Sequence, residues 1–194
     1  MKVERRVIKA ATPRRWVVWA AALLLSGCAA KVSDYAGEKP ALDLAEFFNG
    51  PVRAWGIFQD RSGKVVRRFE VDMIGRWEGD EGVLEEDFRF ADGSTQRRVW
   101  RFRKVDGHTY TGTADDVVGE AEGEVYGNAL RWRYVLALEV DGKVWNVVFD
   151  DWMYLLDDRT MVNRSEMKKF GLRVGEVTLF FRKPASRAKD GDRG

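Results

Sequence analysis

The chain has 194 residues, about the length of one domain with extensions, and its 45% hydrophobic and 33% charged residues are typical of a globular protein. Residues 1–27 hold six of the 33 basic residues and one of the 31 acidic ones, which leaves 27 basic against 30 acidic residues from Cys28 onward. A nucleic-acid-binding protein concentrates positive charge, and this body does not, so we expect no nucleic-acid partner.

The chain contains a single cysteine, Cys28, and a single histidine, His108. An intrachain disulfide or a multi-cysteine metal site is therefore excluded, and we expect neither a metal nor a cofactor. His108 lies in the turn-like segment 105–109, where an exposed, solvated histidine is the usual finding. We therefore do not expect a catalytic triad built on it.

Residues 1–27 are predicted to be an export signal that is removed. A basic stretch is followed by ten apolar residues, 16–25, and then by the small residues Ser26 and Gly27. As a helix, ten residues span about 15 Å, roughly half of a bilayer core, so the run is too short for a permanent transmembrane segment. The segment is read as a signal helix that is cleaved.

The string Leu25-Ser26-Gly27-Cys28 resembles a bacterial lipobox. The resemblance implies cleavage before Cys28 and attachment of diacylglycerol to its sulfur, with membrane anchoring through acyl chains such as palmitate. An ordinary signal peptide that contains a cysteine is the alternative. Ala29 stands where an Asp would resemble an inner-membrane retention signal, so we expect the outer membrane, facing the periplasm.

Residues 28–41 lack any apolar period and are interpreted as a tether, and residues 184–194 as a disordered tail. Between them, 42–183 is expected to form one β-barrel domain that begins with a short helix, which Asp43 caps before the turn 44–48. From there on, turn signals that include several Asp-Gly pairs recur every 8 to 15 residues, which predicts a hairpin meander. Ten strands are expected near 52–59, 64–77, 82–90, 95–105, 109–114, 119–126, 130–140, 143–155, 160–170 and 175–183.

Consecutive strands with short loops favour an all-β, antiparallel up-and-down barrel of about 8–10 strands, because closure removes exposed sheet edges. An open or two-layer sheet is the alternative. The chain also resembles a family of bacterial lipoproteins catalogued as domain of unknown function 3833. The residues that carry this likeness lie at 48–51, 54–56, 112–121, 127–134, 149–154, 167–171 and 175–179. The resemblance implies a lipocalin-like barrel and no established activity.

Charges that share a strand face with large apolar residues are the candidates for a binding site. Glu86 lies between Leu84 and Phe88 in the alternation, and Arg98 lies beside Trp100. Inside a barrel such charges must pair with each other or meet a ligand headgroup. The aromatic residues expected on the same interior side, as walls for an apolar ligand, are Trp100, Trp132, Tyr134 and Trp145. Alternatively, the charges form a structural pair and the rings only fill the barrel.

Two adjacent acid pairs, Asp115-Asp116 and Asp150-Asp151, and the exposed-looking Arg131 and Arg133 complete the candidates. Adjacent strand residues point to opposite faces, so neither acid pair forms a two-carboxylate site by itself, although one Asp from each could combine. Turn caps or rim pairs with arginines are the alternative. We therefore predict a non-enzymatic, lipid-anchored periplasmic protein that binds or shields a hydrophobic or lipid ligand. The alternatives are a filled barrel that docks an envelope protein and an enzyme that uses Asp or Glu.

Overall fold

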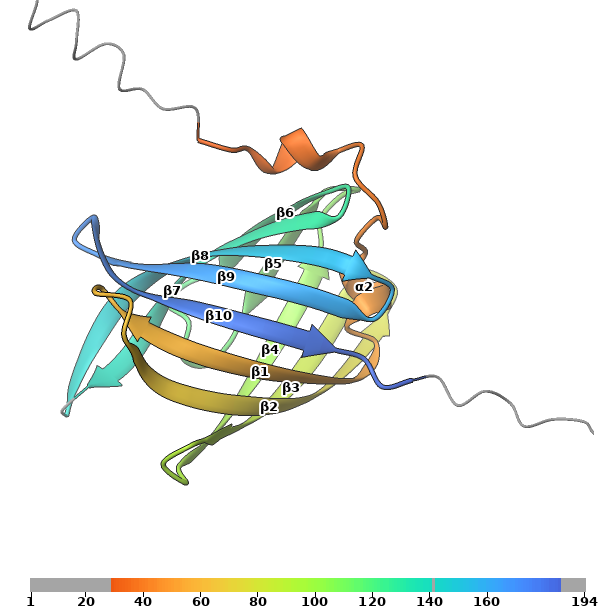
Figure 1. The fold of residues 1–194 in the computed structure, drawn as a ribbon. Helices are drawn as coiled ribbons and strands as arrows, with labels where there is room; N and C mark the ends of the chain where they lie inside the picture. The colour runs from red at the N-terminus through yellow and green to blue at the C-terminus, as the bar shows by residue number, and fades with distance from the viewer. Residues whose placement is uncertain (1–28, 141, 186–194) are drawn as a thin grey trace, which may run out of the picture. The chain divides into compact units, whose positions relative to one another are not determined.

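The computed structural model describes residues 29–140 and 142–185. Ten antiparallel strands follow one another around a closed barrel in chain order, and β1 pairs with β10 to complete it (Figure 1). The strands are β1 (Gly50–Asp60), β2 (Val65–Glu78), β3 (Glu81–Phe90), β4 (Thr95–Lys104), β5 (Thr109–Thr113), β6 (Ala121–Tyr126), β7 (Ala129–Val140), β8 (Lys143–Asp157), β9 (Thr160–Lys169) and β10 (Leu172–Arg182). The predicted up-and-down barrel is confirmed, with each strand close to its expected bounds.

Local turn chemistry separates the strands. In the β1–β2 turn, the Asp60 carboxylate accepts hydrogen bonds from the backbone of Ser62 at 2.8 Å and of Lys64 at 3.2 Å, and Gly63 adopts a positive φ of 89°. The β3–β4 turn repeats this arrangement with Asp92 and Gly93. Because the Asp side chain satisfies turn amides and only glycine adopts this backbone conformation freely, these short strings end one strand and begin the next.

Helix α2 (Leu44–Phe47) lies at one end of the barrel, opposite the tips of the β7–β8 and β9–β10 hairpins (Figure 1). Asp43 caps it as expected, accepting a hydrogen bond from the Glu46 amide at 3.0 Å. Phe48 packs edge-on against Phe181 of β10, and its carbonyl lies where a Cβ on Gly75 of β2 would stand. We call the end sealed by α2 the closed end and the end with the β1–β2, β3–β4, β7–β8 and β9–β10 hairpins the mouth.

The closed half of the barrel is packed solid with aromatic rings. Trp100 and Trp132 meet edge to face with centroids 5.8 Å apart, and Phe102 contacts both. Two glycines make room for Trp132, because a Cβ on Gly112 or Gly123 would lie 2.8 or 2.2 Å from its ring. This half therefore has no space for a ligand.

Part of the segment expected as a tether is folded on the barrel. A 3-10 turn, η2 (Val32–Tyr35), buries Val32, and Tyr35 packs against Trp152 and Tyr154 of β8. Further along, the Leu42 amide donates a hydrogen bond to the Gly127 carbonyl at 2.7 Å. The apolar residues of this segment are spaced irregularly, so no helix or strand period revealed that they bind a neighbour.

The predicted signal peptide 1–27, the lipid-attachment residue Cys28 and residues 186–194 of the predicted tail lie outside the described residues. Among the residues that are described, no helix is long and apolar enough to cross a membrane.

Candidate functional site

A layer of polar side chains crosses the middle of the barrel interior, above the aromatic packing of the closed half. We call this layer the polar floor. It draws one or two residues from each of six segments: Glu86 (β3), Arg98 (β4), Asp116 (the β5–β6 loop), Tyr134 (β7), Asp151 (β8), and Asn163 and Ser165 (β9). Strand register places Glu86 opposite Arg98 and Asp151 opposite Ser165, so residues far apart in sequence meet on one level.

Arg98 is the single basic residue of the polar floor. Its Nε and Nη2 donate to both carboxylate oxygens of Asp116 at 2.7–3.0 Å, and its Nη1 lies 3.7 Å from Glu86. The β5–β6 loop delivers Asp116 to this place because the Ala137 amide of β7 donates to the Asp116 carbonyl at 2.8 Å. A two-pronged pair of this kind is among the stronger interactions in proteins, so it fixes both the loop and the guanidinium.

Asp151 is a second buried acid of the polar floor, after Glu86. Its Oδ2 lies 3.5 Å from the Tyr134 hydroxyl and 3.4 Å from the Asn163 amide nitrogen, both long contacts. Its Oδ1 has no hydrogen-bond partner in the described part of the chain, and neither have Glu86 Oε2, Asn163 Oδ1 and Ser165 Oγ. Buried polar atoms are usually satisfied, so a group of four acceptor atoms at one level indicates a place for water or a ligand.

Burial alters the acid chemistry of the polar floor. Removal from water raises the pKa of Glu86 to about 7, although Arg98 opposes the change. Burial likewise raises the pKa of Asp151 to about 6 and raises that of Tyr134 well above its usual value. For Arg98, burial alone lowers the pKa, but Glu86 and Asp116 outweigh that effect and raise it. Arg98 is therefore always charged, whereas Glu86 and Asp151 titrate near neutrality.

A cavity of about 150 Å³ lies between the polar floor and the mouth. Its base is formed by Glu86, Arg98, Asn163 and Ser165, and its walls are apolar: Phe58, Phe69, Phe88, Phe90, Leu136, Leu138, Phe149, Val177 and Leu179. Arg67, whose guanidinium stacks 3.5 Å above the Phe90 ring, lines it on the mouth side. The cavity thus offers a polar base and an apolar shaft, the arrangement that suits an amphiphile.

The hairpin tips at the mouth carry exposed apolar side chains. Phe170, between β9 and β10, is 90% exposed, and Leu172 and Val144 are also exposed. Lys169 places its Nζ 3.4 Å above the Trp145 ring at the same rim. Single exposed apolar residues are ordinary, but a group of them around the entrance to a cavity is a feature of interaction sites.

Four of the six predicted ligand-binding residues line the cavity: Glu86, Arg98, Trp100 and Tyr134. Trp132 is buried below them in the packed half and is not part of the lining. The expected interior position of Trp145 is wrong, since the residue is 39% exposed. The reason is that β8 pairs with β9 only from Val148 onward, so the first residues of β8 project beyond the rim with β7 alone.

The structure also shows what the two adjacent acid pairs and His108 contact. Asp116 pairs with Arg98, and Asp150 pairs with Arg131 at 2.6 Å on the outer face, so one Asp of each adjacent pair is held by an arginine. Asp151, the other Asp of the second pair, lies inside the barrel in the same polar floor as Asp116. However, no group of three or more metal-ligating side chains occurs in the described segments. His108 is exposed in its turn, as expected, and stacks on Tyr126.

Sequence reasoning missed the contribution of Asn163 and Ser165 to the polar floor. Both alternate with Met161 and Met167 on β9, so a polar pair on an otherwise apolar face was the available signal.

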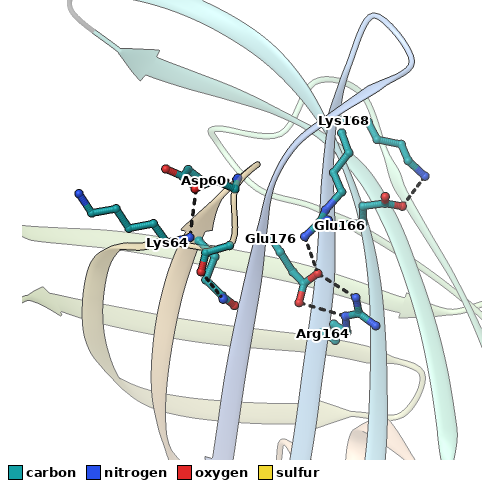
Figure 2. A network of polar contacts seen from close by, with 10 residues as sticks. Asp60, Lys64, Arg164, Glu166, Lys168 and Glu176 are labelled. Atoms are coloured by element: carbon teal, nitrogen blue, oxygen red, sulfur yellow. Dashed lines mark hydrogen bonds and ion pairs between the residues drawn. The ribbon is translucent and has the colours of Figure 1, made fainter.

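On the outer wall the pattern of charges is different, because acidic residues there are paired with basic ones. Figure 2 shows Glu176 held by Arg164 at 2.9–3.0 Å and Glu166 paired with Lys168. Arg173 adds a second partner for Glu176.

The closed barrel and its buried polar level can be compared with known proteins. The family model described as protein of unknown function (DUF3833) matches residues 22–183. The chain belongs to this family. The expected resemblance to domain of unknown function 3833 is therefore confirmed. A search of curated proteins gives no match.

Two solved structures share the barrel of this DUF3833 protein. The S-type phycobiliprotein lyase CPES from Guillardia theta has a TM-score of 0.53 and 8% identity, covering 81% of this chain and 100% of that one. A protein of unknown function from the DUF3598 family of Nostoc punctiforme has a TM-score of 0.51 and 13% identity, covering 76% of this chain and 51% of the other, about half its length. At these identities the likeness extends to the fold alone.

Proposed function

We propose that this DUF3833 protein is a lipid-anchored periplasmic protein whose barrel binds an amphiphile, without catalysing a reaction on it. The observation that carries the proposal is the cavity of about 150 Å³, with a buried polar base and apolar walls, at the end of the barrel away from α2. Cavities of about this size hold a group as large as benzene. The polar end and first carbons of the ligand therefore fit inside, and the rest of an apolar chain extends along the mouth.

The rim supports the same proposal. Phe170, Leu172 and Val144 surround the entrance and would contact the part of a chain that leaves the cavity. The fold supports a binding role only generally, since barrels of this size enclose either packed side chains or one small ligand. Here the closed half is packed and the mouth half is not.

A cavity-filling substitution tests ligand binding. The full chain in lipid nanodiscs is titrated with 1-hexanol by ligand-observed NMR, with empty nanodiscs as the blank. Leu179 faces the cavity and Val148 faces outward, so Leu179→Trp should abolish saturable binding and Val148→Trp should leave it intact. Equal binding by both variants, or no saturable binding by the unmodified chain, would refute the amphiphile site.

The membrane anchor rests on Cys28, the sole cysteine, preceded by Leu25-Ser26-Gly27. Cys28→Ser should abolish incorporation of labelled palmitate in the producing cell. Ser26→Ala keeps a small residue before the cleavage point and should retain labelling. Unchanged labelling of the Cys28→Ser chain would contradict the anchor, and fractionation of the labelled protein decides between outer and inner membrane.

A docking function is the second candidate, and an outer groove favours it. The groove, about 710 Å³, runs over β10, β1, β2 and β3, with Trp55 and Phe180 half-exposed beside it. A photo-crosslinking residue at position 180 would give one discrete adduct in cells if an envelope protein binds there, and Trp55→Ser would remove it. That result combined with no hexanol binding would favour docking over ligand binding.

A further inference from the structure

The polar floor carries more acids than bases. Glu86, Asp116 and Asp151 face one arginine, Arg98, and no other ionisable group apart from the phenol of Tyr134 contributes to this level. At this level the strands that close the ring, β1, β2 and β10, contribute Phe58, Met73 and Val177, none of which carries a charge. Besides Glu86 and Arg98, the charged side chain among the described residues that line the cavity is Arg67 of β2, which lies on the mouth side and pairs with Asp92 at 3.3 Å. With all three carboxylates ionised, the base of the cavity has a formal charge of −2.

The guanidinium, phenol and amide donors of the polar floor are already engaged, and the Ser165 hydroxyl, which can donate or accept, has no hydrogen-bond partner in the described part of the chain. Arg98 gives its Nε and Nη2 to Asp116 and turns Nη1 toward Glu86. The Tyr134 hydroxyl and the Asn163 amide both point to Asp151. A carboxylate or phosphate headgroup that entered the cavity would therefore find Arg98 occupied and would face excess negative charge, so an anionic ligand is disfavoured.

The atoms that lack a partner can all accept a hydrogen bond, although the Ser165 hydroxyl can also donate one. Glu86 Oε2, Asn163 Oδ1 and Ser165 Oγ belong to residues that line the cavity, and Glu86 is 8% exposed. A primary ammonium group carries three N–H donors and one positive charge, which matches three acceptor atoms of which one belongs to a carboxylate. A hydroxyl offers one donor and no charge, so it satisfies this arrangement less completely.

We propose that the polar floor recognises a primary ammonium headgroup, with Glu86 as its carboxylate partner and Asn163 and Ser165 as neutral acceptors, while the ligand's chain points to the mouth. The inference rests on the proposed function, since it assigns the headgroup class of the same cavity. Because burial raises the pKa of Glu86 to about 7 and of Asp151 to about 6, ammonium binding should strengthen as both lose their protons. Their protonation at low pH should weaken it.

The test compares three probes with the same short chain: hexylammonium, 1-hexanol and hexanoate, each titrated at pH 8 into the full chain in nanodiscs, with ligand-observed NMR as the readout. The expected order of affinity is hexylammonium, then hexanol, then hexanoate. Glu86→Gln, which keeps the shape and loses the charge, should weaken hexylammonium binding roughly tenfold or more and leave hexanol nearly unchanged.

The matched control is Glu85→Gln, the same change one residue away on the outer face of β3, where Glu85 pairs with Arg76 and Arg97. It should leave all three affinities unchanged. The unmodified chain supplies an independent measurement if Glu86→Gln does not fold: hexylammonium affinity should fall between pH 8 and pH 5, and hexanol affinity should not.

The outcomes are distinct. Two results would overturn the ammonium assignment: tightest binding by hexanoate, or a hexylammonium affinity that changes neither with pH nor on Glu86→Gln. Either result would be compatible with the amphiphile site, because a probe still binds the cavity. No saturable binding by any of the three overturns both.

Discussion

At the residue scale, two glycines determine how the Trp132 ring packs in the barrel interior, because they have no side chain. Trp132 stays buried because Gly112 and Gly123, on the neighbouring strands β5 and β6, leave a flat surface for its ring. Close packing of this kind leaves no room for an added methyl group, since interiors are packed to crystal density. The two glycines therefore have a packing role and not a turn role.

Gly123→Ala should destabilise the protein by roughly 1–3 kcal/mol, because its Cβ would lie 2.2 Å from the Trp132 ring and force the ring to move. Gly107→Ala is the control: a Cβ there meets no atom within 4 Å, and its backbone is not in the left-handed region. Urea denaturation of both variants measures the difference. Equal stability of the two would show that the ring yields without cost.

Glu86 should make the stability of the fold depend on pH. Its pKa is about 7 in the folded chain against 4.5 for an unperturbed Glu, so the folded state holds the proton more tightly. The folded state therefore binds more protons between these values, and its stability falls as the pH rises through them. Glu86→Gln lacks this titration. Relative to that variant, the unmodified chain should lose on the order of 3 kcal/mol between pH 4.5 and pH 8.

Urea denaturation at pH 4.5, 6 and 8 checks this expectation. Asp151 remains in both proteins, so its own contribution cancels in the difference. Parallel stability curves for the two proteins would mean that Glu86 has the same pKa in the folded and unfolded states.

At the scale of elements, α2 determines which end of the barrel is sealed. One turn of helix has little stability of its own, so it depends on its cap and on the packing of Phe47 and Phe48. Asp43 serves twice here, because it caps the Glu46 amide and pairs with Lys104 of β4 at 3.4 Å. The Lys183 ammonium also donates to the Glu46 carbonyl at 2.8 Å, so the chain beyond β10 holds the same turn.

Asp43→Ala should cost about 1 kcal/mol of stability through the lost cap. Glu46→Ala is the matched control, since it keeps the backbone amide and carbonyl that make both contacts, and it should change stability by less than about 0.5 kcal/mol. Thermal melts followed by circular dichroism compare the two. A larger effect of Glu46→Ala would mean that its carboxylate, and not the cap, holds the helix.

At the scale of the whole molecule, the folded unit extends further toward the N-terminus than the barrel itself. Val32 and Tyr35 pack on the outside of the barrel, and Leu42 joins the β6–β7 turn. Any membrane anchor at Cys28 would therefore be separated from the folded unit by only a few residues of chain.

A fragment of residues 42–183 should fold as a β protein, and one of residues 31–183 should be more stable by about 2 kcal/mol, because it also buries Val32 and the Tyr35 ring. Val32→Ser in the longer fragment should remove much of its extra stability, which separates the effect of packing from that of chain length. Denaturant melts measure all three. Identical midpoints for the two fragments would show that η2 adds nothing to the fold.

The sequence by itself determined the ten strands, their turns, the short capped helix and the up-and-down order. These are local properties: side chains alternate with a period of two, and Asp and Gly set turn geometry within a few residues. Closure was favoured, because a meander without helices leaves edges that a barrel removes, but an open or two-layer sheet stayed an alternative until the pairing of β1 with β10 was seen.

Only the tertiary structure decided the polar floor, the burial of Val32 and Leu42 and the exposed position of Trp145. Glu86 and Arg98 were recognisable because they share a face with apolar neighbours, but their meeting with Asp116, Asp151, Asn163 and Ser165 depends on register across six segments. Trp145 alternates in step with the inward-facing residues of β8, but β8 extends beyond β9 at this point, so Trp145 lies exposed at the rim. Alternation in the sequence determines on which face of the sheet a side chain lies. The residues that lie opposite it depend on how whole strands pair.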